Sequence, residues 1–328
     1  MIRFFKSPQP AALFSIPLIV ILLWAERFFV FPVASESYSM PLWSLLSLAF
    51  KSMPSWINFF IFVALISVEA IYFNLLVNKH EVLYRNSYLP ALFFVLFVSA
   101  IPSFLVIHPI HFVSLILLRI FDKIFSFHKH GRMIVSIFDC GFLAATAALL
   151  YFPAIPILLL LMFSLSIMRP FNIKEWLVLL IGYALPFMFL SVLKFWNHEL
   201  IEFWNGFFAH MVEPIDKMVY PTSLELRFLS GVLLLMVLLS WLRLRANYYK
   251  NIIRVRTYQQ ILFFSFALGI ASIFFSKDLH WIHFLILVIP LSLWFAYYFV
   301  SQKRRMWLVE GLLWIFIGSI LWNHIVGS

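Results

Sequence analysis

The sequence has few charged residues, one cysteine and few glycines, and each scarcity excludes a class of protein. Only 12% of the 328 residues are charged and 64% are hydrophobic, whereas a soluble domain carries about 25% charged residues. The single cysteine, Cys140, excludes a disulfide framework and a cysteine-based metal site. Nine glycines and long unbroken apolar runs exclude an outer-membrane barrel, whose strands alternate apolar and polar residues. We therefore expect a polytopic helical membrane protein.

Eleven apolar segments are candidates for membrane-spanning helices, each of which needs about 20 residues. They are 11–30, 55–78, 88–107, 110–127, 132–151, 153–168, 173–196, 224–243, 260–276, 280–300 and 306–326. The fourth segment carries three charges, so an amphipathic helix lying on the surface is its alternative. The predicted fold is all-α, a transmembrane helical bundle forming a single integral membrane domain over 1–328. We expect the first span to be retained, because no small-residue cleavage site follows it.

The basic residues support this count and predict the orientation. With the N-terminus in the cytoplasm, seventeen of the 24 Lys and Arg residues fall in cytoplasmic loops and six on the other side. Cytoplasmic loops of membrane proteins carry such an excess. If 110–127 did not span, the later basic clusters would lie outside. The net charge of +10 is thus explained by topology, and the expected partner is a lipid bilayer and not nucleic acid.

Three segments outside the spans are long enough to have structure of their own. The segments 31–54 and 197–223 contain aromatic residues and are predicted to form interfacial helices on the outer face. The basic cytoplasmic loop 243–260 interleaves Arg and Lys with Tyr and Ile. This composition favours a helix lying on anionic headgroups.

Three ionisable residues lie deep inside predicted spans, where such residues are costly and mark functional sites. They are Glu69, Arg119 and Asp139, and counting residues places all three about 10–14 Å from the cytoplasmic end of their spans. The common depth predicts a buried cluster. Its role is either to fix helix packing or to bind an ion, a proton or a headgroup.

Acidic residues gather on the predicted outer side. Glu26 ends the first span, a position that resembles that of the catalytic acid in lipid-linked sugar transferases of the GT-C type. The resemblance implies that Glu26 acts as general base or metal ligand, with Glu199, Glu202 or Asp216 assisting. The alternative is that Glu26 pairs with its neighbour Arg27.

Histidines also favour the predicted outer side. The pairs His108/His111 and His280/His283 have the spacing of metal ligands on a helix. Neither pair encloses a glutamate, and Pro109 is expected to interrupt the first helix. We therefore predict no metal site. No glycine-rich phosphate loop, GxSxG elbow or Ser-x-x-Lys pair is present, so the sequence specifies no cofactor.

Two stretches of the chain have distinctive sequences. The first runs from Asn74 to Phe97, NLLVNKHEVLYRNSYLPALFFVLF. The second runs from Ile137 to Pro186 and holds an Asp139…Gly141 pair and the run from Arg169 to Trp176. Together they resemble an uncharacterised family of Bacteroidota multi-pass inner-membrane proteins of unknown function. The resemblance implies the bacterial inner (cytoplasmic) membrane and no particular reaction.

The run from Arg169 to Trp176 has a physical reading of its own. Pro170 ends one helix, Asn172 caps the next, and Glu175 at its third position completes the cap. The alternative is that Arg169 and Lys174 bind a lipid phosphate.

The sequence is compatible with three functions. The first is an envelope enzyme acting on a lipid-linked, polyprenyl-type substrate at the outer face. The second is a transporter or flippase that uses the Glu69, Arg119 and Asp139 level. The third is a non-catalytic subunit with a protein partner in an envelope complex.

Overall fold

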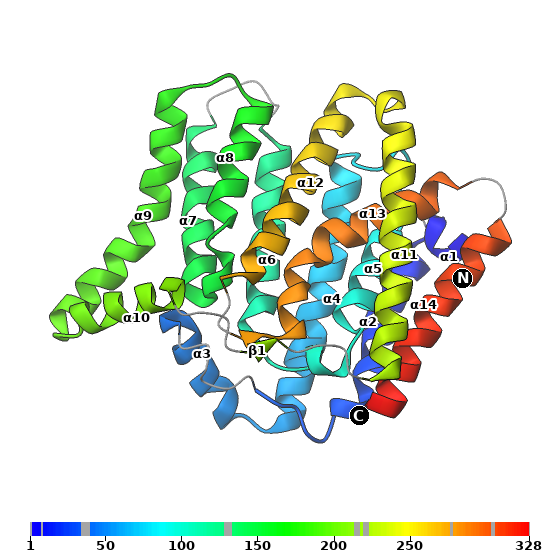
Figure 1. Cartoon of the computed structure of the whole chain (residues 1–328), viewed down its shortest axis with the longest axis horizontal. Helices are drawn as coiled ribbons and strands as arrows, with labels where there is room; N and C mark the ends of the chain where they lie inside the picture. Colours follow the sequence, from blue (N-terminus) through cyan, green and yellow to red (C-terminus); the bar gives the residue numbers. More distant parts are fainter. Residues whose placement is uncertain are drawn as a thin grey trace.

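The chain folds as a bundle of helices with two very short strands at one end (Figure 1). The computed structural model describes residues 2–7, 9–33, 40–127, 133–212, 217–218, 223–275, 278–302 and 306–327. The α-helices are α1 (Ile2–Lys6), α2 (Pro10–Trp24), α3 (Pro41–Ser52), α4 (Ser55–Lys79), α5 (Leu89–Val98), α6 (Pro109–Phe125), α7 (Ile134–Leu150), α8 (Ile157–Met168), α9 (Ile173–Trp196), α10 (Leu200–Val212), α11 (Leu224–Asn247), α12 (Ile253–Ile273), α13 (Val288–Ser301) and α14 (Met306–Gly327). Short 3-10 helices are η1 (Ala25–Arg27), η3 (Pro102–Phe104), η4 (Phe152–Ala154), η5 (Tyr248–Lys250) and η6 (Trp281–Leu287).

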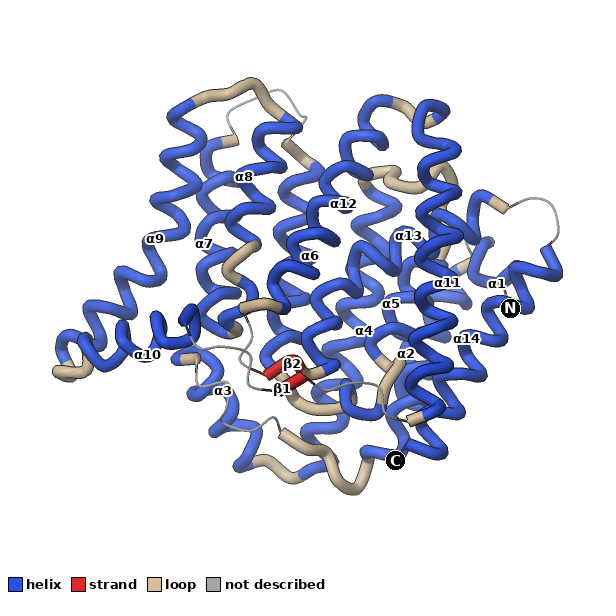
Figure 2. Tube along the Cα trace, viewed as in Figure 1, coloured by secondary structure: helices blue, strands red, loops and turns tan. Residues whose placement is uncertain are grey.

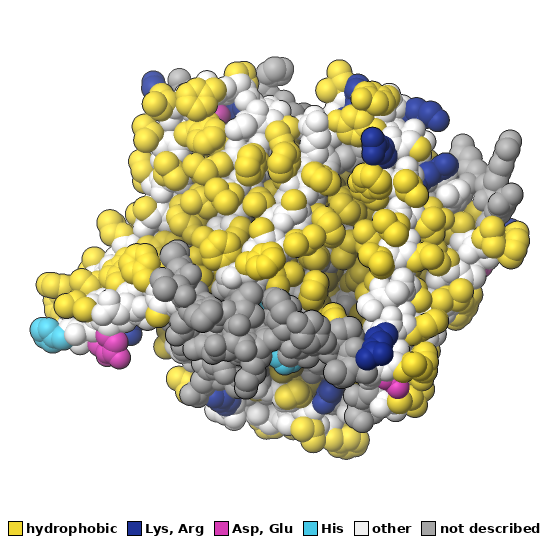
Figure 3. Space-filling view, viewed as in Figure 1, with side chains coloured by type: hydrophobic (Ala, Val, Ile, Leu, Met, Phe, Trp, Pro, Cys, Tyr) yellow, Lys and Arg dark blue, Asp and Glu magenta, His cyan; other side chains and the backbone are white. Residues whose placement is uncertain are grey.

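Six helices in the described part of the chain are long and apolar enough to cross a membrane, as expected of a multi-pass membrane protein. These helices are Pro10–Arg27, Ser55–Lys79, Ile173–Trp196, Leu224–Lys250, Trp281–Ser301 and Met306–Val326. The helices α9 and α11 leave large apolar side chains such as Phe189, Leu193 and Leu234 exposed. Hydrophobic side chains cover most of this face of the molecule, and charged ones gather toward its margins (Figure 3). Such a surface suits hydrocarbon rather than water.

Every predicted span contains helix, but the spans 88–107 and 280–300 are interrupted in their interior. The segment 88–107 is α-helical only over α5, whose ten residues are all buried, and then continues through irregular backbone and η3. The segment 280–300 begins with the 3-10 helix η6 before α13 starts. Irregular backbone is tolerated at membrane depth only where protein surrounds it. Because η3 and η6 contact each other inside the bundle, this condition is met.

The predicted interfacial segments contain the helices α3 and α10. Both lie at one end of the bundle together with the strands β1 (Lys217–Met218) and β2 (Asp278–Leu279), which pair in parallel (Figure 2). We call this the α3–α10 end. The opposite end carries the α8–α9 connection, 169–172, and the α11–α12 connection, 248–252 (Figure 1). We call it the basic end.

The prediction of a surface helix over 243–260 is wrong. The structure instead runs α11 on to Asn247, turns through η5 and starts α12 at Ile253. The basic residues therefore sit at the ends of two long helices, because the apolar residues between them continue the helical faces of α11 and α12.

Two glycines allow a close contact between the helices α7 and α9. A Cβ atom added to Gly141 would lie 2.3 Å from the Leu179 carbonyl oxygen, and one added to Gly182 would lie 2.4 Å from the Phe138 carbonyl oxygen. Small residues let membrane helices approach until their backbones touch. The glycine of the Asp139…Gly141 pair is thus explained by packing.

We predict that Gly141→Ala forces α7 and α9 apart. Overpacking of this kind costs about 1–3 kcal/mol, so the unfolding temperature of the purified protein in detergent should fall. Gly231→Ala on α11 is the matched control, because no atom lies within 4 Å of the added Cβ atom. In a helix interior, alanine is more favourable than glycine by about 1 kcal/mol. Equal unfolding temperatures for the two variants would contradict the packing role.

Candidate functional site

A pocket of about 460 Å³ lies at the α3–α10 end. Glu199 and Glu202 line it with Phe203 and Gly206, and a spacing of three or four residues places these side chains on one face of a helix. The opposite wall comes from the start of α3. The remaining lining residues are Met40, Pro41, Ser44, Lys194 and Phe207. The pocket thus combines carboxylates, one ammonium group and aromatic rings.

The turn between α9 and α10 determines which charged side chains of this pocket pair with each other. His198 adopts a φ of 60°, a left-handed conformation that helps to reverse the chain. The turn brings Lys194 to Glu199, with Nζ 2.6 Å from Oε2. Glu202, almost one helical turn further on, is exposed and has no ion-pair partner among the described residues. Of the two carboxylates, Glu202 is therefore the one available to a ligand or to a reacting proton.

Of the four predicted catalytic acids, the structure brings Glu199 and Glu202 together and places Glu26 elsewhere. Glu26 Oε1 lies 3.3 Å from His324 Nδ1 and 3.6 Å from Arg27 Nε. The other ring nitrogen of His324 donates to the carbonyl oxygen of Ser99 at 2.8 Å. Glu26 thus connects the C-terminal helix α14 to the end of α2. This agrees with the alternative prediction, in which Glu26 pairs with Arg27. Asp216 lies outside the described residues.

Buried histidines occupy the interior between η3 and η6. His108 caps α6, with Nδ1 accepting from the backbone N–H of Ile110 at 3.2 Å, so Pro109 starts this helix and does not interrupt it as predicted. The Tyr151 hydroxyl hydrogen-bonds His283 Nδ1, and the rings of His108 and Tyr151 are 5.4 Å apart. Among the described residues no three His, Cys, Asp or Glu side chains are placed to hold a metal. These histidines serve as polar connections inside the bundle.

The three deep charges do not form the predicted cluster. Arg119 donates to Tyr72 and lies 3.5 Å from Asp122, and its side chain is 57% exposed. Asp139 instead pairs with Lys123 at 2.8 Å. Glu69 is completely buried near the backbone of α6, and neither oxygen has a hydrogen-bond partner in the described structure. Residue counting gave the depth of each charge but not the side of the helix on which it lies.

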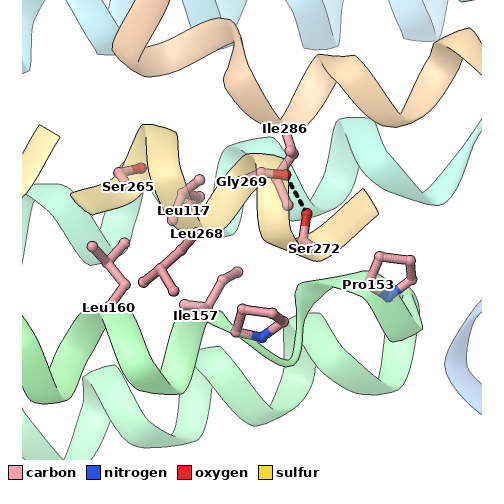
Figure 4. A pocket seen from close by; sticks show the side chains of 10 residues that line it. Leu117, Pro153, Ile157, Leu160, Ser265, Leu268, Gly269, Ser272 and Ile286 are labelled. Atoms are coloured by element: carbon pink, nitrogen blue, oxygen red, sulfur yellow. Dashed lines mark hydrogen bonds between the residues drawn. The ribbon is translucent and has the colours of Figure 1, made fainter. Parts of the chain in front are cut away.

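A small, largely apolar cavity lies between α6, α8 and α12 (Figure 4). It has about 20 Å³ of space, which is room for about one water molecule. Leu117, Ile157, Leu160 and Leu268 line it from α6, α8 and α12. Neither Glu69 nor Asp139 borders it.

Sequence reasoning missed the charge network centred on Asp122. Its Oδ1 accepts from Lys79 Nζ at 2.8 Å and lies 2.7 Å from His80 Nε2. Its Oδ2 accepts from the Tyr72 hydroxyl at 3.4 Å. The signal was present in the spacing of Arg119 and Asp122, three residues apart on one helix, and in the basic pair that ends α4. This network joins α4 to α6 at the basic end.

The predicted cap by Asn172 at the start of α9 is confirmed, whereas Glu175 forms an ion pair in place of the cap bond predicted for it. The Asn172 side chain accepts from the backbone N–H of Lys174 at 3.1 Å. Glu175 pairs with Arg169 at 3.0 Å, so the guanidinium neutralises an acid of the same turn. Binding of a lipid phosphate by Arg169 and Lys174 stays a prediction, and the ion pair leaves Lys174 as the less engaged of the two cations.

Comparison with known proteins gives one match. The model of DUF6427, a family of unknown function, matches residues 14–326. The chain belongs to this family. No curated protein and no solved structure matches it significantly. DUF6427 thus agrees with the expected resemblance in having no assigned reaction, whereas the Bacteroidota source and the GT-C likeness stay predictions.

We predict that His108 makes this DUF6427 protein sensitive to acid. Burial, with the neighbouring imidazoles of His111, His283 and His280, lowers the pKa of His108 well below its usual value. Below about pH 6.5 the unfolded chain therefore takes up a proton that the folded imidazole does not, and each pH unit costs up to about 1.4 kcal/mol. Unfolding temperatures measured at pH 7 and pH 5 should show this loss.

His108→Asn should reduce the loss between pH 7 and pH 5, because asparagine keeps the helix cap and does not titrate. His198→Asn is the control, since His198 is exposed and is not among the imidazoles that shift the pKa of His108. If both variants keep the full acid sensitivity, His108 is not its source.

Proposed function

We propose that the protein crosses the bacterial inner membrane eleven times, with its N-terminus in the cytoplasm. In support, each of the eleven predicted segments contains some helix, and six of these helices are long and apolar enough to cross a membrane. The segments assigned to the cytoplasm meet one another at the basic end, where Lys6 donates to the carbonyl oxygen of Gln302 at 3.1 Å and Arg243 to that of Ser301 at 3.1 Å. In this orientation the α3–α10 end faces outward.

We further propose that the protein is an envelope enzyme that acts on a lipid-linked substrate of the polyprenyl type at the outer face, in the manner of GT-C transferases. The observation that supports this is the pocket between α3 and α10. It lies where two amphipathic helices meet the predicted membrane interface, and it offers charged groups beside aromatic rings. A phosphate-bearing headgroup could meet Lys194, with its apolar chain against Phe203 and Phe207.

Glu202 is our candidate general base. A base must carry a lone pair that no cation occupies, and Lys194 already neutralises Glu199. Glu202 thereby takes the role that the sequence gave to Glu26, whose carboxylate is held by His324 and Arg27.

The test is purification with native lipids, followed by mass spectrometry of the extracted lipids. The wild-type protein should retain a polyprenyl-type lipid, and Phe203→Arg should retain much less of it. Glu202→Gln should keep the lipid and slow its conversion about 10²–10⁴-fold, the usual contribution of a general base. The lipid-linked intermediate should therefore accumulate in cells that carry this variant.

Glu225→Gln is the matched control, because Glu225 lies in the first turn of α11 and does not line the pocket. It should behave as the wild type. A preparation that carries no polyprenyl lipid but a protein partner in equal amount would reject the enzyme and support a subunit of an envelope complex.

The second candidate is a transporter or flippase. The interrupted helices favour it, because broken spans commonly build transport sites at mid-membrane. Glu69, buried without a hydrogen-bond partner in the described structure, lies in α4. Glu69→Gln separates the two functions: it should abolish transport across vesicles, whereas an enzyme acting at the outer pocket should tolerate it.

A further inference from the structure

A second pocket of about 460 Å³ lies at the basic end, between α11 and α12. Its rim carries polar groups, including Arg245, Tyr248 and Gln260. Its deeper wall is apolar, with Trp241, Phe263 and Trp294. The positions of these residues along the helices explain why the polar groups lie at the rim. The helices α11 and α12 are joined at 248–252, so residues farther from this connection in the sequence lie deeper in the bundle. The pocket thus changes from polar to apolar toward the middle of the bundle.

Gln259 is a buried amide on the wall of this pocket. It is only 9% exposed, and neither its oxygen nor its nitrogen has a hydrogen-bond partner in the described structure. Leaving such a group unpaired costs free energy comparable to a lost hydrogen bond. Its neighbour Gln260 is satisfied, since Nε2 donates to the Tyr248 hydroxyl at 2.9 Å. An amide that is buried, unpartnered and in contact with a pocket points to a polar ligand.

Arg245 supplies a positive charge at the rim. Its guanidinium lies 5.4 Å from the centre of the Trp241 ring, and no carboxylate pairs with it among the described residues. The nearby arginines are engaged, Arg243 with Ser301 and Arg254 with Glu81. Arg245 is therefore free to bind an anion, and a guanidinium matches phosphate geometry well.

We propose that this pocket binds one anionic glycerophospholipid from the adjoining leaflet. Arg245 holds the phosphate, Gln259 hydrogen-bonds the glycerol or ester oxygens, and an acyl chain lies against Trp241, Phe263 and Trp294. The occupant follows from the order of the wall, because a charged head and an apolar chain are needed at the same time. The site is separate from the pocket between α3 and α10 and does not depend on the function proposed for it.

The test is a titration of the delipidated full-length protein in neutral detergent with phosphatidylglycerol, followed by native mass spectrometry and by the rise in unfolding temperature. We expect one tightly held lipid per chain. Arg245→Gln should weaken binding about tenfold, the effect of losing one charge-assisted hydrogen bond. Lys250→Gln is the matched control, because it removes a neighbouring charge that does not line the pocket. Because salt screens an exposed charge outside the pocket, Lys250→Gln should change the affinity less than about twofold.

Gln259→Leu tests the site without changing charge, and stays informative if Arg245→Gln fails to fold. Leucine removes the unpaired amide, so the lipid-free protein should unfold at the same or a higher temperature. The temperature rise produced by phosphatidylglycerol should nevertheless shrink. Equal losses with Arg245→Gln and Lys250→Gln would mean general surface attraction and overturn the proposal. Equal affinity for zwitterionic phosphatidylcholine, or an unchanged lipid response in Gln259→Leu, would also overturn it.

Discussion

A polar group held between apolar helices must find its partner inside the protein, because hydrocarbon offers none. This constraint accounts for the pairs that join distant parts of the chain. The Trp24 indole donates to the Ser99 hydroxyl at 2.8 Å, and the carbonyl oxygen of Ser99 accepts from His324. Serines within helices solve the same problem locally, as Ser67 does by donating to the carbonyl oxygen of Val63. These polar residues serve as connections within the bundle.

The same constraint explains where the backbone departs from the α-helix. The ten residues of α5 are all buried, so the irregular segment that follows is enclosed by protein. Close contact of α7 and α9 through Gly141 and Gly182 uses a different means of stabilisation, packing without polar groups. Not every buried polar group meets this requirement, because the carboxyl group of Glu69 and the amide of Gln259 are both buried without a hydrogen-bond partner in the described structure.

The two ends of the bundle differ in chemistry. At the α3–α10 end, acids and aromatic rings surround a pocket next to amphipathic helices. At the basic end, one arginine, Arg245, and two tyrosines line a pocket together with apolar side chains. Both arrangements suit molecules with a polar head and an apolar chain, but the charges at the rims differ. The pocket between α3 and α10 offers carboxylates, whereas the pocket between α11 and α12 offers a cation and a buried amide.

The sequence by itself determined the apolar environment, the approximate position of the long apolar helices and the cap at Asn172. These depend on local properties, namely the hydrophobicity of about 20 neighbouring residues and the spacing of cap residues. Only the tertiary structure decided which charges meet. Glu69, Arg119 and Asp139 share a depth, yet they face different neighbours, and Glu26 binds a histidine nearly 300 residues away. Depth follows from counting residues along a helix, but a pairing also requires the rotation of each helix about its axis and the identity of the helix beside it.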